Sequence, residues 1–122
     1  MIRDLVAVVA GGAVGTALRL GIDALIPHAD DAFPVSTLII NTVGAFALGL
    51  LVARLWGSAP SWLRAALGPG LLGSFTTFSA LAVSLVTLVD AERWMTALAY
   101  LAVTLLLGFG AAALGLRLGR HP

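Results

Sequence analysis

Apolar residues fill long stretches of the chain, and most charged residues stand at the ends of these stretches. Three intervals carry no charged residue in their interior: Asp31 to Arg54, Arg64 to Asp90, and Arg93 to Arg117. Each interval is long enough for a helix to cross about 30 Å of hydrocarbon, which requires roughly 20 residues. The pattern predicts three membrane-spanning helices, at about residues 35–56, 63–88 and 94–116.

A fourth apolar stretch, at about residues 5–26, contains two charged residues, Arg19 and Asp23. They are four positions apart, so a helix places them on one face, where they can pair. The charged start and short apolar core of this stretch are also typical of a signal peptide. The helical pattern continues past Arg19, however, and no stretch typical of a soluble domain follows. We therefore expect an all-α integral membrane protein with four transmembrane helices in one domain, residues 1–122.

The composition agrees with a membrane protein. Hydrophobic residues are 60% of the chain and charged residues 11%, whereas a soluble domain has roughly half and a quarter. Cysteine is absent, which excludes a disulfide framework, a thiolate metal site and a cysteine nucleophile. The net charge is only +1, so no nucleic-acid partner is expected.

Small residues recur at four-residue spacing in the predicted helices. The pairs are Gly11 and Gly15, Ala45 and Gly49, Gly108 and Ala112, and Ala111 and Gly115. Such pairs allow helix backbones to approach closely in lipid. Four short helices with this many packing faces are expected to form part of a larger assembly.

A few polar residues lie near the middle of the predicted helices. Asn41 follows Thr37 by one turn, and Tyr100, Thr104 and Gly108 form one stripe of the last helix. A hydroxyl can bond its own helix, but Asn41 cannot satisfy both amide donors in that way. We expect Asn41 to have a functional or interhelical role. The last three helices have no ionisable residue at mid-depth, which argues against a proton relay.

The third predicted helix contains the segment "GLLGSFTTFSAL", Gly70 to Leu81. Pro69 precedes it and weakens the start of the helix. Glycines and hydroxyls within about two turns then predict a break at membrane depth, which lipid tolerates only where protein or a wet cavity surrounds it. Freed carbonyls at such a break suit a cation, and freed N–H groups suit an anion. An uncharged path rich in donors favours a small anion.

Three segments occur in a fixed order: "GGAVGTALRL", "NTVGAFALG" and "GLLGSFTTFSAL". They resemble the Gly-rich first helix with its Arg, the N-x-x-G-x-F-x-x-G second helix and the G-x-x-G-x-x-T-T-F-S third helix of the Fluc (CrcB-type) fluoride channel family. The resemblance covers essentially the whole chain. It implies a passive, fluoride-selective channel that exports cytoplasmic fluoride and protects against its toxicity. It also implies an antiparallel, dual-topology dimer with two pores and a central structural sodium ion.

The resemblance implies roles for individual residues. The sodium ligands would be the backbone carbonyls of Gly73 and Thr76 from both subunits. Arg19 would lie near the aqueous vestibule. The fluoride pore would be lined by Asn41, Thr77, Phe78, Ser79, Tyr100 and Thr104.

Two positions depart from the family pattern. The family commonly has a second Phe three residues after the first, and here that position is Leu81. Leu offers no electropositive ring edge to fluoride, so a pore built with it is expected to conduct weakly or not at all. Gly108 stands where the polar stripe after Thr104 would often carry another hydroxyl, so the track is shortened.

Arginine placement bears on orientation. After four crossings, both termini and the loop between the second and third helices share one side, which holds Arg3, Arg54, Arg64, Arg117 and Arg120. The other side holds Arg93 and, nearest it, Arg19. This bias predicts cytoplasmic termini. A homodimer of opposed subunits needs a weak bias, so a homodimer and a heterodimer with a homologous subunit both stay open.

Two other readings come from different classes. A small multidrug-resistance-type transporter also has four helices, but it needs a membrane-embedded carboxylate in its first helix, and none lies between Asp4 and Asp23. The other alternative is a non-conducting membrane scaffold or partner subunit. The expectation adopted is a fluoride channel in the cell membrane, not an enzyme.

Overall fold

The computed structural model describes residues 1–120, and within this range every regular element is a helix. The elements are α1 (Ile2–Leu25), α2 (Val35–Leu55), α3 (Ser61–Ala65), η1 (Ala66–Leu72), α4 (Gly73–Phe75), α5 (Phe78–Asp90) and α6 (Trp94–Gly119). Four segments are long and apolar enough to span a membrane: Ile2–Leu25, Val35–Leu55, Ser61–Asp90 and Trp94–Gly119. The four predicted spanning helices are confirmed, with ends within about three residues.

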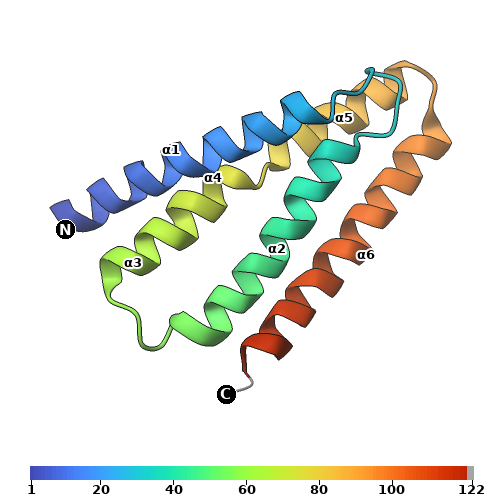
Figure 1. Cartoon of the computed structure of the whole chain (residues 1–122). Coiled ribbons are helices and arrows are strands. Elements are labelled where there is room, and N and C mark those ends of the chain that lie inside the picture. Colours follow the sequence, from blue (N-terminus) through green and yellow to red (C-terminus); the bar gives the residue numbers. More distant parts are fainter. Residues whose placement is uncertain (121–122) are drawn as a thin grey trace.

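The helices form two closely packed pairs (Figure 1). α1 lies along α3, η1 and α4, and α2 lies along α6. Glycines permit the first contact, because a methyl group on Gly11 or Gly15 would overlap the backbone carbonyl of Ala66 or Leu71. The predicted packing role of this glycine pair is confirmed.

The contact between α2 and α6 also depends on small residues. A Cβ on Gly49 would overlap the carbonyl oxygen of Ala112, and one on Gly115 would overlap that of Phe46. Gly108 differs, since nothing lies within 4 Å of the position that its Cβ would take. The expected packing role of Gly108 is therefore not seen within the described part of one chain.

The outer surface of the helices is apolar. Val9, Leu106 and Phe109 each expose more than two thirds of their surface (72%, 74% and 74%). A soluble protein would bury side chains of this kind, whereas lipid tails accommodate them. The buried core is correspondingly small. Its one cluster of buried residues among those described lies where α5 meets α6 and contains Leu81, Leu88, Ala97 and Tyr100.

The third spanning segment is irregular in two places. Pro69 does not end the helix, because residues Ala66–Leu72 form a π-helix whose wider turn carries it. The break comes later, where Thr76 has ψ 152° and Thr77 has φ −145° and ψ 108°, both extended. The predicted break in the third helix is confirmed, but the glycine-proline segment only widens the helix.

Candidate functional site

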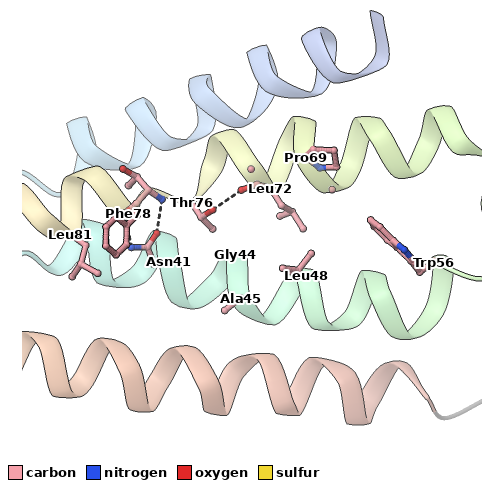
Figure 2. Close-up of a pocket in the computed structure, with 13 residues that line it drawn as sticks. Asn41, Gly44, Ala45, Leu48, Trp56, Pro69, Leu72, Thr76, Phe78 and Leu81 are labelled. Carbon is pink, nitrogen blue, oxygen red and sulfur yellow. Dashed lines mark hydrogen bonds between the residues drawn. The ribbon is translucent and has the colours of Figure 1, made fainter. Parts of the chain in front are cut away.

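The helix break is held by Asn41 of α2 (Figure 2). Its Oδ1 accepts a hydrogen bond from the Thr77 N–H at 2.8 Å, and its Nδ2 donates to the Thr77 carbonyl at 3.1 Å. One side chain thus satisfies both backbone groups of an extended residue at membrane depth, where unpaired groups are costly. Gly44, one turn later, gives the break room, because a Cβ there would overlap the Thr76 side chain. The interhelical role expected for Asn41 is present.

Two hydrogen bonds at the break divert N–H groups from their helical partners. In a continuous α-helix, the Thr77 N–H would bond the Gly73 carbonyl and the Ala80 N–H would bond the Thr76 carbonyl. The first N–H instead bonds Asn41, and the second donates to the Thr77 hydroxyl at 3.1 Å, which caps α5. The carbonyls of Gly73 and Thr76 therefore lose their usual helical donors.

The residues described offer a cation no side-chain cluster. Among residues 1–120, no group of three or more His, Cys, Asp or Glu side chains is placed to hold a metal ion. A cation bound near the break would depend on backbone oxygens. The diverted hydrogen bonds leave two such oxygens, on Gly73 and Thr76, so the chain fits the sodium site that its motif implies.

Arg19 reaches the break from α1. Its Nε donates to the Ser74 carbonyl at 3.1 Å, while Asp23 accepts a hydrogen bond from the Ser36 hydroxyl at 2.9 Å. The two residues therefore have separate partners. The suggested Arg19–Asp23 pair does not form within the described residues, because each side chain instead hydrogen-bonds a polar group on another segment.

A groove of about 540 Å³ runs between α2 and the third spanning segment, and Asn41, Leu48, Gly73 and Phe78 are among the residues that line it. Figure 2 shows Phe78 beside Asn41 and Leu81 at one end of this groove. The Phe78 side chain is 81% exposed in the single chain, whereas Leu81 is buried. Ser79 is exposed as well, and its hydroxyl lies 3.2 Å from that of Thr77. Four predicted pore residues, Asn41, Thr77, Phe78 and Ser79, are thus brought together at the break.

The other two predicted pore residues, Tyr100 and Thr104, lie on α6 and do not line this groove. Tyr100 is completely buried and stacks edge-on against Phe33, with ring centroids 5.4 Å apart. Within residues 1–120, the hydroxyls of Tyr100 and Thr104 are buried side-chain groups without a hydrogen-bond partner. The side chains of Thr37, Ser84 and Thr104 lie within interaction range of the Tyr100 hydroxyl, although none of them makes a hydrogen bond of good geometry with it. The predicted pore residues thus form two groups.

A second pocket, of about 420 Å³, opens at the end of the bundle that carries the α1–α2 connection. Its lining includes Asp23, His28, Asp30, Ser36, Thr37 and Ser84. Residues 27–34, which join the first two predicted helices, contain no predicted site residue. The sequence feature that could have indicated this pocket is an acidic residue and a histidine in a short loop next to the Ser36–Thr37 pair. The capping role of Thr77 was also missed, although threonine is a preferred residue at a helix start.

Comparison with known proteins gives a consistent result. The family described as "CrcB-like protein, Camphor Resistance (CrcB)" matches residues 6–116. The "Fluoride-specific ion channel FluC" of Paracoccus denitrificans is 40% identical over 110 residues, covering 90% of this chain and 89% of that protein. "Fluoride-specific ion channel FluC 1" of Mycobacterium tuberculosis is 38% identical over 121 residues, with 98% and 92% covered. "Fluoride-specific ion channel FluC 2" of Symbiobacterium thermophilum is 41% identical over 119 residues, with 91% and 93% covered.

Proposed function

The chain belongs to the CrcB family, and from this premise we propose that it is a fluoride-selective ion channel through which cytoplasmic fluoride leaves passively. It is a multi-pass membrane protein of an ion-channel family, not an enzyme. The observation that carries the proposal is the helix break that Asn41 holds at Thr77. Such a break gathers hydrogen-bond donors at membrane depth without a fixed charge that would trap the anion.

Selectivity follows from what replaces the water around fluoride. Fluoride is small and strongly hydrated, so a pore needs donors close to its path. An amide nitrogen has two hydrogens, and Asn41 uses one for Thr77, so the second is available to an anion. The hydroxyls of Thr77 and Ser79 and the electropositive edge of the Phe78 ring lie at the same break. In this proposal Tyr100 and Thr104 continue the polar track, and the charge of Arg19 raises the electrostatic potential at the outer part of that track.

A sodium ion is proposed at the carbonyls of Gly73 and Thr76, contributed by both subunits. The support is the loss of their helical donors to Asn41 and to the Thr77 hydroxyl. When bound, the cation would supply positive charge close to the anion path and tie two broken helices together. Neither effect requires a carboxylate, in agreement with the carbonyl-only donor set.

The working unit in this proposal is an antiparallel dimer. Its support is the large exposed ring of Phe78 together with the exposed Gly73 on the open groove, which a second subunit would cover. The partner is either an identical copy or a homologous chain. The arginine bias and Leu81 favour a homologous chain, and the numbered names of relatives, FluC 1 and FluC 2, agree with paired gene products.

Ion efflux from liposomes tests the proposed function. The chain, alone and together with a homologous subunit, is reconstituted with potassium fluoride or potassium chloride inside and valinomycin present. We expect rapid fluoride release and little chloride release, at a rate independent of a proton gradient. Equal release of both halides would refute selectivity. Release that requires a proton gradient would instead indicate a coupled transporter.

A further inference from the structure

The second pocket connects surface charges to the buried hydroxyls of the bundle. Figure 1 shows the α1–α2 connection beside α5, and both line this pocket. Ser36 and Thr37 on its wall are almost completely buried. Thr37 and Ser84, which line the pocket, are also within interaction range of the hydroxyl of the fully buried Tyr100. The pocket therefore leads from the surface toward the cluster of buried hydroxyls around Tyr100.

The titratable groups around this pocket are mainly acidic. Asp23, Asp30 and His28 line it. The only ion pair within residues 1–120 joins Arg93 to Asp31 at 3.9 Å, and it involves neither of the two lining carboxylates. Arg19 lies one turn before Asp23 on α1, but its Nε is bound to the Ser74 carbonyl. An anion that enters here thus passes two carboxylates that no ion pair neutralises.

We propose that this pocket is one mouth of the fluoride path and that the carboxylates of Asp23 and Asp30 lower the rate at which fluoride passes through it. The inference rests on the proposed fluoride-channel function. A negative charge at a narrow mouth lowers the local concentration of anions, because the poorly polarisable walls focus its field. Asp23 is held at the wall by its hydrogen bond from Ser36. Its charge therefore stays at the entrance.

The test neutralises each carboxylate and measures fluoride efflux at several ionic strengths. Asp23→Asn keeps an oxygen to accept the Ser36 bond, and Asp30→Asn changes an exposed loop residue, so both variants should fold. At low ionic strength we expect fluoride efflux to rise about two- to threefold for each change. The gain should vanish near 1 M salt, where the screening length is about 3 Å.

Asp90→Asn and Glu92→Gln are the matched controls. Both residues are exposed at the same end of the bundle and do not line the pocket. They should raise efflux much less than the two pocket variants. Equal gains in pocket and control variants, no gain, or a gain that persists in 1 M salt would overturn the inference while leaving fluoride conduction intact. Absence of fluoride flux from the unaltered protein would instead refute the proposed function, and the inference with it.

Discussion

Replacing Asn41 by alanine tests how the helix break supports conduction. The change removes both hydrogen bonds to the Thr77 backbone, at 2.8 and 3.1 Å. Thr77 is buried, so water replaces these bonds poorly. The Thr77 N–H then either stays unpaired or returns to the Gly73 carbonyl, which would lengthen α4 across the break. Either result removes part of the proposed site: a donor for fluoride in both cases, and a sodium ligand in the second.

The size of the effect follows from these bonds. A buried backbone group left unpaired costs about 1–3 kcal/mol, so two such groups would cost about 2–6 kcal/mol of stability unless the helix re-forms. For transport, loss of a hydrogen bond to a charged group costs about 1.5–3 kcal/mol. If that bond is made at the barrier, transit slows by about tenfold or more.

Fluoride efflux from liposomes and the thermal stability of the purified protein measure the two effects separately. We expect Asn41→Ala to lose at least nine tenths of the flux. Asn41→Asp keeps an acceptor for the Thr77 N–H but adds a negative charge, so it should conduct no better. Thr42→Ala, the next position on α2 and outside the groove lining, should behave as wild type. Wild-type flux and stability in Asn41→Ala would refute the reasoning.

Three further outcomes are expected. Phe78→Ile removes the electropositive ring edge of a residue that is 81% exposed in the single chain. Fluoride efflux should fall about tenfold, while assembly on size-exclusion chromatography stays unchanged. Unchanged efflux would show that the ring does not line the fluoride path. Gly115→Ala would overlap the Phe46 carbonyl and should lower the melting temperature, whereas Gly108→Ala faces open space and should not; equal effects would contradict the α2–α6 contact. If the arginine bias fixes the orientation, a cysteine that replaces the exposed Ser58 should react with an impermeant label from only one side of the membrane. Labelling from both sides would favour the homodimer.

The spanning helices were predictable because lipid imposes a simple rule on the sequence. Charged residues such as Arg64 and Asp90 mark the ends of a span, and the length of the apolar stretch between them shows that a helix there can cross the membrane. Small-residue pairs also indicated close packing correctly for Gly15 and Gly49. Gly108 shows the limit of this rule, since spacing alone does not say whether a neighbouring helix is present on that face.

The break was predictable in kind but not in detail. Glycines and hydroxyls near Thr77 indicated a weak helix, yet the position of the break depends on Asn41, which is 36 residues away in sequence. Only packing of α2 beside the third segment brings the two together. The same reason explains Arg19, whose bond to the Ser74 carbonyl no local pattern on α1 indicates.

The most direct test of the central claim is the reversal potential of the current in a planar bilayer, with fluoride and chloride gradients of opposite direction. Asn41, Phe78 and the hydroxyls at the break are proposed to replace the water around fluoride and not that around chloride. The current carried by this protein, with its partner subunit where one is required, should therefore reverse close to the fluoride equilibrium potential and stay there when the pH on one side is changed. Reversal at the chloride potential, or a shift that follows the proton gradient, would contradict the account.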